Sequence, residues 1–207
     1  MPEYRLLTLL NYTTRTYFIR LFYNYENLFG QGLSFCLKPH FSHKANWAED
    51  KPDMPEKHEG FFNMNEYMSG FAIGIIINSE HQHPDRTEKI KKVLSSVLGS
   101  LGDTIIYRIV LPVMVLFALN IFLISGNTLT GWAVSFIISQ LVIFNIFSFA
   151  IRFYGLKAGI KHGIGSLKIF KSKKYFALIK VLKNIRNFLA MSLVAIIIIR
   201  INILLFF

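Results

Sequence analysis

The chain has 207 residues, of which 53% are hydrophobic and 17% charged, and its formal net charge is +11. Soluble domains average roughly 45–50% apolar and about 25% charged residues, so this composition argues against an ordinary soluble domain. A basic chain can bind nucleic acid, but no recognition motif accompanies the charge, and nucleic acid is therefore not expected as a partner. The single cysteine, Cys36, excludes an internal disulfide.

The N-terminal residues 1–38 are rich in Leu, Tyr and Phe and are interrupted by arginines. This pattern predicts two amphipathic helices that lie on the membrane or pack against a partner, with Gly30 and Gly32 as breakers. Residues 39–60 are instead rich in Pro, His, Asp, Glu and Lys, which predicts a polar loop or a short polar helix.

The segment 61–83 contains a short apolar run, from Met68 to Ser79. As a helix this run would be about 18 Å long. That length is too short to cross a hydrocarbon core of about 30 Å, so we expect a re-entrant half-span. Gly70 and Gly74 would give the helix a face that another backbone can approach closely.

Residues 84–108 form a lysine-containing cytoplasmic lead-in that includes a glycine-interrupted turn at Leu98–Asp103. The next segment, 109–151, contains two uncharged apolar blocks, Ile109–Ser125 and Trp132–Ile151. Each block is close to the roughly 20 residues that a membrane-spanning helix needs. We therefore expect a transmembrane helical hairpin here.

The basic segment 152–187 contains ten Lys or Arg and no acidic residue, whereas the hairpin loop, Gly126–Gly131, has no charge. By the positive-inside rule the loop is outside and both ends of the hairpin are cytoplasmic. The basic segment would then face anionic lipid headgroups or an acidic partner. The last segment, 188–207, is hydrophobic except for Arg200, which must snorkel or find a partner. The prediction is a single all-α integral membrane domain over 1–207.

Polar residues flank the short apolar run and the glycine turn. Short or glycine-broken segments beside polar groups are how transporters place a binding site at membrane depth, and carboxylates, amides and aromatic rings suit the hydroxyls and apolar face of a sugar. The alternative is that these groups cap helix ends or satisfy backbone at the membrane interface. The candidates on this argument are Asn63, Asn65, Glu66, Glu80, Gln82 and Asp103.

Other chemistries are poorly supported. His81 and His83 adjoin Glu80, but no cysteine or second histidine pair lies nearby at ligand spacing, so no metal is expected. The sequence contains no nucleotide-binding loop, no serine elbow and no paired carboxylates of known spacing. We therefore expect no cofactor and no catalytic residues of the chain's own. A membrane-bound enzyme using Asp103 or Glu80 as acid or base would need a convergent site that the sequence does not show.

The order of polar and glycine landmarks along nearly the whole chain resembles that of the membrane subunit IID of the mannose/fructose/sorbose phosphotransferase family. The landmarks are Asn24-Tyr25-Glu26, Gly32 to Pro39, Phe61-Phe62-Asn63, Gly74, Glu80, Gln82, Gly102-Asp103, Pro112, Arg152-Phe153-Tyr154-Gly155 and Gly159.

This resemblance implies a multi-pass protein of the bacterial cytoplasmic (inner) membrane, surrounded by membrane lipid. With a IIC membrane subunit it would form the unit that translocates a hexose of the mannose type. The IIA and IIB phosphocarrier components would relay phosphate from phosphoenolpyruvate to that sugar. By position among the landmarks, the groups expected on the substrate pathway or at subunit contacts are Asn24, Glu26, Asn63, Glu80, Gln82 and Asp103.

The chain is expected to be a shortened, divergent member. The family usually has a proline before the Gly-Asp turn, where this chain has Ser96-Val97-Leu98. Arg108 is displaced relative to Pro112, and family members commonly continue well past the position of Phe207. The alternative hypothesis is therefore a structural or regulatory membrane protein that keeps the fold but has lost transport.

Overall fold

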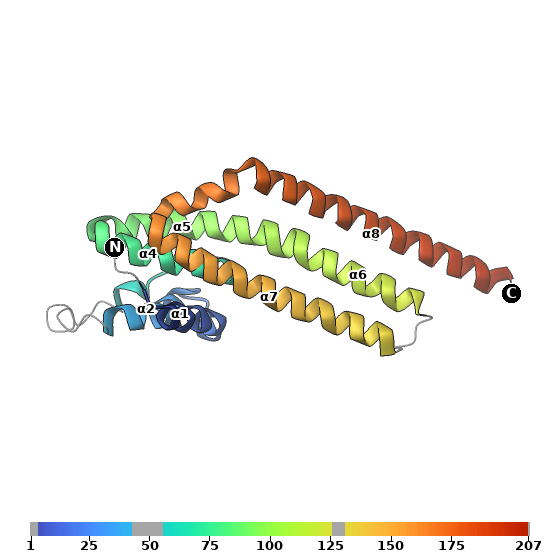
Figure 1. Cartoon of the computed structure of the whole chain (residues 1–207), viewed down its shortest axis with the longest axis horizontal. Coiled ribbons are helices and arrows are strands. Elements are labelled where there is room, and N and C mark those ends of the chain that lie inside the picture. Colours follow the sequence, from blue (N-terminus) through green and yellow to red (C-terminus); the bar gives the residue numbers. More distant parts are fainter. Residues whose placement is uncertain (1–3, 43–55, 126–130, 207) are drawn as a thin grey trace. The chain divides into compact units, whose positions relative to one another are not determined.

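The computed structural model describes residues 4–42, 56–125 and 131–206 (Figure 1). These residues form helices joined by short connections, with two isolated backbone bridges and no strand among them. The chain divides into two compact units. Unit 1 comprises Met1–Asp103 and Ser148–Lys168, and unit 2 comprises Thr104–Phe147 and Ile169–Phe207.

Unit 1 begins with two helices, as predicted: α1 (Leu6–Phe18) and α2 (Gly30–Ser42). The 3-10 helix η1 (Ile19–Phe22) follows α1 directly. Gly32 does not break α2, contrary to the prediction. A Cβ at Gly32 would lie 2.6 Å from the carbonyl oxygen of Ile19, so the glycine serves close packing of α2 on η1.

The predicted polar loop is partly helical. Helix α2 runs through Pro39 to Ser42, and the short 3-10 helix η2 covers Glu56–His58. Residues 43–55, the middle of the predicted loop, lie outside the described residues.

The short apolar run forms α4 (Ser69–Gln82), which follows the 3-10 helix η3 (Glu66–Met68). Residues Ser69 to Glu80 are all buried within unit 1. The predicted close approach at its glycines is confirmed: a Cβ at Gly74 would overlap the carbonyl oxygen of Leu156 and lie 2.9 Å from the nitrogen of Ile160. That α4 enters the membrane as a re-entrant half-span stays a prediction.

The predicted glycine-interrupted turn at Leu98–Asp103 is wrong. After the 3-10 helix η4 (Pro84–Arg86), the chain continues without interruption; the successive elements are α5 (Thr87–Gly102), the π-helix η5 (Asp103–Val110) and α6 (Leu111–Ile124). Gly102 is buried against Asn65, whose Cγ would contact any added Cβ. This glycine therefore marks close packing rather than a break in the helix.

The remaining chain forms α7 (Gly131–His162), the 3-10 helix η6 (Gly163–Lys171) and α8 (Lys173–Phe206). Three helical stretches are long and apolar enough to cross a membrane by length and composition, namely Pro84–Ile124, Gly131–Lys171 and Lys173–Ile203. The fold class is thus confirmed as an all-α membrane protein. Lysine and arginine are good helix formers, and the basic segment 152–187 is helical except for a bend at Ser172.

In unit 2, α8 packs along α6, and hydrogen bonds that could not be expected from the apolar sequences of these helices join the two. Asn120 of α6 donates from Nδ2 to the carbonyl of Leu189 at 3.1 Å and accepts at Oδ1 from Ser192 Oγ at 2.8 Å. Arg200 donates to the carbonyl of Leu123, in the last turn of α6. Arg200 therefore finds the partner that burial in an apolar segment requires.

A fourth bond of this kind reaches a carbonyl of the π-helix η5, four residues before Pro112. In an α-helix the carbonyl of Arg108 would accept from the N–H of residue 112, but Pro112 has none. The guanidinium Nη1 of Arg186 donates to this carbonyl at 3.0 Å. This exposed bond ties α8 to the helical stretch that precedes α6.

Candidate functional site

A connected strip of polar residues in unit 1 contains four of the six residues that the family resemblance singles out. These four are Asn24, Glu26, Asn63 and Asp103. At the start of the strip, the side chain of Asn24 accepts the backbone N–H of Glu26 at 3.0 Å and of Asn27 at 2.7 Å. This geometry is an Asx turn, and Leu28 closes it with φ +52. Glu26 itself is exposed on the turn.

The turn is joined to the segment before α4. The N–H of Phe62 donates to the carbonyl of Asn27 at 3.2 Å, and the next residue, Asn63, donates its N–H to Ser95 Oγ of α5 at 2.7 Å. Two residues on, Asn65 Nδ2 donates to Asp103 Oδ1 at 2.9 Å. The strip thus runs from the Asn24 turn to the end of α5, and its exposed members are Glu26, Asn63 and Asp103.

A charged group lies beside the strip. Glu66 is 90% removed from solvent at its side chain and binds Arg20 of η1 with an Nη1–Oε1 distance of 2.9 Å. Arg152 of α7 is buried, with its guanidinium carbon 4.3 Å from the ring centre of Tyr17 and 4.8 Å from that of Tyr67. These are cation–π distances.

Sequence reasoning named Glu66 as a candidate but missed its partner Arg20 and the role of Arg152. Arg20 was noted only as an interruption of the apolar N-terminal residues, and Arg152 only as a family landmark and the first residue of the basic segment. The available signal was that Arg152 directly follows the uncharged block Trp132–Ile151, since an ionisable residue beside a membrane span is a candidate functional group.

The other two predicted residues, Glu80 and Gln82, lie at the C-terminal end of α4. Gln82 is exposed as the last residue of the helix. Glu80 is fully buried at its side chain, where Lys57 Nζ lies 3.3 Å and His58 Nε2 lies 3.6 Å from Oε1. Glu80 is therefore the buried carboxyl group of a local cluster of ionisable side chains, whereas Gln82 makes no such contact.

His58 is held neutral in this cluster. Burial lowers its pKa to about 3, with further lowering by the charges of Lys91, Lys57 and the nearby His40. Lys91 is also buried and donates to Glu88 Oε2 at 3.0 Å. An uncharged imidazole between two lysines avoids adding a third positive charge to the interior.

The histidines nearby do not assemble a metal site in the part of the chain that the structure describes. The rings of His40 and His81 are 5.0 Å apart at their centres. No group of three or more His, Cys, Asp or Glu side chains among the described residues could hold a metal ion.

The two places differ in what they can do. The strip offers amide and carboxylate groups at the surface next to aromatic residues such as Tyr25 and Phe61, which are exposed. Such groups can hydrogen-bond sugar hydroxyls or the polar atoms of another subunit. In the Glu80 cluster the side chains of Glu80 and His58 are closed to solvent, whereas Lys57 is exposed at its edge; this burial suits a structural role.

Comparisons with known proteins agree with the resemblance. A family model described as the mannose/fructose/sorbose family IID component of the PTS system matches residues 7–205. The chain is similar to a chain in the structure of the mannose transporter ManYZ with microcin E492, with a TM-score of 0.67 and 21% identity over 94% of this chain and 71% of that one.

A second solved structure, titled only as a membrane protein, gives a TM-score of 0.73 and 21% identity over 93% of this chain and 71% of that one. At this identity the likeness to both structures shows the fold alone. No protein with a curated function matches the chain.

Proposed function

Since the chain belongs to the mannose/fructose/sorbose family of phosphotransferase IID components, we propose that it forms, with a IIC membrane subunit, the path by which a hexose crosses the membrane. The IIB component would phosphorylate the sugar on the cytoplasmic side, with phosphate relayed through IIA. The observation that carries this proposal is the family match over residues 7–205, almost the whole chain. Phosphorylation gives the sugar a charge, so that it cannot return.

The three long apolar helices support a location in the bacterial cytoplasmic membrane. The ManYZ structure, which is titled as a mannose transporter, supports a sugar of the mannose type and a second membrane subunit as partner. Within the chain, the polar strip is the surface that we assign to the sugar pathway or to contacts with IIC. Its exposed carboxylates, Glu26 and Asp103, and its amides have the chemistry that either role needs.

The proposal is tested by reconstituting the chain with a IIC subunit and the IIA and IIB components from its own genome, and measuring phosphoenolpyruvate-dependent uptake of labelled mannose. We expect uptake to require this chain. Assembly without uptake of any hexose would favour the structural or regulatory alternative. Failure to assemble would contradict the partnership itself.

The strip is tested in the same system by Asp103→Asn, with Asp85→Asn as the matched control, because Asp85 is exposed on η4. Asparagine keeps an oxygen to accept from Asn65 but removes the charge. Hydrogen bonds to charged groups are worth about 1.5–3 kcal/mol, so we expect uptake to fall by about tenfold or more in the first variant only. Equal uptake in both variants and the unchanged chain would remove Asp103 from the pathway.

A further inference from the structure

The charged residues of unit 2 are all positive, and most of them lie close together. The sequence of unit 2 contains eight Lys or Arg and no Asp or Glu. Seven of the eight are Arg108 and the cations between Lys171 and Arg186, so one end of the unit carries nearly all of its charge. Unit 2 therefore has no acidic group of its own with which to neutralise these residues.

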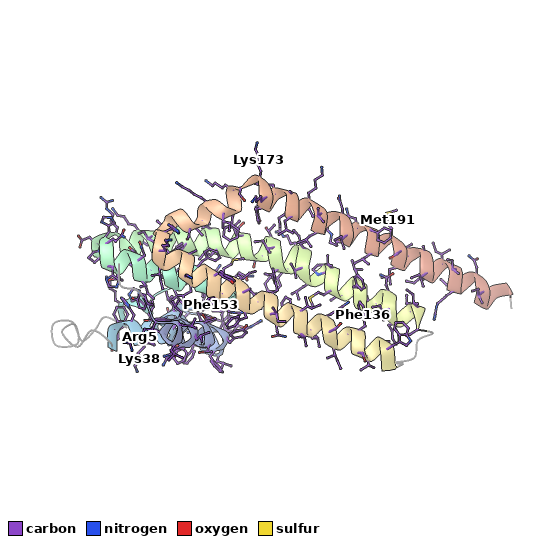
Figure 2. All side chains as sticks on the ribbon, in the orientation of Figure 1. Arg5, Lys38, Phe136, Phe153, Lys173 and Met191 are labelled. Atoms are coloured by element: carbon purple, nitrogen blue, oxygen red, sulfur yellow. The ribbon has the colours of Figure 1, made fainter. Side chains whose placement is uncertain are left out.

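The two arginines of α8 are already engaged with unit 2. Arg186 donates to the carbonyl of Arg108, and Arg200 donates to the carbonyl of Leu123. In contrast, Lys173, Lys180 and Lys183 are exposed, as is Lys174. The side chain of Lys173 projects from the start of α8 (Figure 2).

The three lysines follow one side of the helix. Lys173 and Lys180 are seven residues apart, which is close to two helical turns, and Lys183 follows within one more turn. An adjacent face carries exposed apolar side chains at the helical spacing i, i+4 and i+7, namely Val181, Ile185 and Phe188. A cationic stripe beside an apolar stripe is typical of a helix at the boundary between headgroups and hydrocarbon.

The length of α8 places the nearer end of this stripe, Lys180 and Lys183, at that boundary. Residues 187–206 alone would be about 30 Å long, enough to cross the hydrocarbon core. The preceding turns, Lys173–Arg186, are therefore not needed inside it. Lysines just beyond the end of a span can extend to the headgroups while their methylenes stay in apolar surroundings.

We propose that the lysine stripe of α8, defined as Lys173, Lys180 and Lys183, binds the phosphate headgroups of anionic phospholipids, with Val181, Ile185 and Phe188 against the acyl chains. Charge complementarity and the adjacent apolar face both select this ligand. A neutral or zwitterionic headgroup would leave three cations without a net counter-charge. The site is independent of sugar transport and of the subunit partnership.

The experiment uses the full chain, purified in detergent, titrated with phosphatidylglycerol or phosphatidylcholine and followed by native mass spectrometry. A lysine near an anionic surface changes the affinity by roughly fivefold. We expect phosphatidylglycerol to bind more tightly, and the triple variant K173Q/K180Q/K183Q to lose on the order of 100-fold of that affinity. Replacing the same three lysines by arginine keeps the charge and should keep the binding.

The matched control removes three exposed lysines elsewhere, K89Q/K92Q/K161Q, and has the same net charge as the first triple variant. It should bind phosphatidylglycerol nearly as the unchanged chain does. Far-ultraviolet circular dichroism checks that each variant folds. Equal binding of the two lipids, or an equal loss in both triple variants, would overturn the proposal. The proposal would also be overturned if the triple variant K173Q/K180Q/K183Q lost binding to an acidic soluble protein while its binding of phosphatidylglycerol stayed unchanged.

Discussion

Gly74 and Gly99 both lie inside helices but have different surroundings. Gly74 faces the backbone of α7, whereas a Cβ at Gly99 would meet no atom within 4 Å. We expect Gly74→Ala to destabilise the protein by about 1–3 kcal/mol, because backbone cannot move aside as a side chain can. Gly99→Ala should stabilise it by about 0.5–1 kcal/mol, since alanine loses less backbone entropy in a helix. Unfolding of the purified variants in a denaturing detergent titration measures both.

His58 makes a second prediction at this scale, on pH. Its pKa is about 3 in the folded protein and about 6.5 in the unfolded chain. Between these values the unfolded chain binds a proton that the folded protein does not, so stability is complete above pH 6.5 and falls as the pH is lowered toward 3. The slope contributed by His58 is at most about 1.4 kcal/mol per pH unit.

The check is the pH dependence of the unfolding free energy in His58→Gln, compared with His83→Gln, whose histidine is exposed. Glutamine does not titrate, so the first variant should have a shallower slope between pH 6.5 and 4.5. The His83 variant should keep the original slope. Parallel curves for all three proteins would show that His58 is not held neutral.

Among the elements, α8 is joined to η5, just before Pro112, by the bond from Arg186 to the carbonyl of Arg108. Arg186→Met should cost about 0.5–1.5 kcal/mol, the usual net contribution of a hydrogen bond, because this bond is exposed. In a Pro112→Ala background the helix regains an N–H for the carbonyl of Arg108, and the same substitution should cost much less. The double-mutant cycle, measured by detergent unfolding, isolates this coupling. Additive costs would contradict the compensation.

The pair α6 and α8 shows what sequence reasoning can reach in the fold. Uncharged blocks of about 20 residues and a short apolar run predicted the long helices and α4, because length and composition alone decide them. The partner of Arg200 could not be predicted, since Leu123 lies 77 residues away. Gly102 was misread as a turn because a glycine that breaks a helix and one that allows close packing look alike without the neighbour, here Asn65.

The candidate site was predictable in its residues but not in its grouping. Polar residues around the short apolar run were found from their position along the chain. Asn24 and Asn63 belong to one strip because the backbone of Asn27 pairs with that of Phe62. No sequence pattern predicts this contact. Glu80 looked equivalent to Asp103 in sequence, yet the packing of η2 buries one carboxylate while the other stays exposed.

At the scale of the whole molecule, the contacts within unit 2 show in which direction each of its helices runs. Arg186 bonds to Arg108 in η5, and Arg200 bonds to Leu123 in α6, which continues from η5. The two bonds follow the same order along both stretches, so α8 and α6 run in the same direction. Helix α7 returns against α6, as the stacked rings of Phe117 and Phe136 show on either side of their connection. If α6 leaves the cytoplasm, α7 re-enters it and α8 leaves it again.

Asn202, near the end of α8, is therefore expected outside, and Lys171, before α8, inside, because the basic end stays cytoplasmic by the positive-inside rule. Both positions are exposed, so each can carry a single reporter cysteine. The native Cys36 should stay unlabelled because it is buried and its pKa is raised to about 12, which leaves almost no reactive thiolate. In intact cells a membrane-impermeant maleimide should label Asn202→Cys, and label Lys171→Cys only after permeabilisation. Labelling of both from the same side would mean that α8 does not cross, and its bonds to α6 would then have to form outside the bilayer.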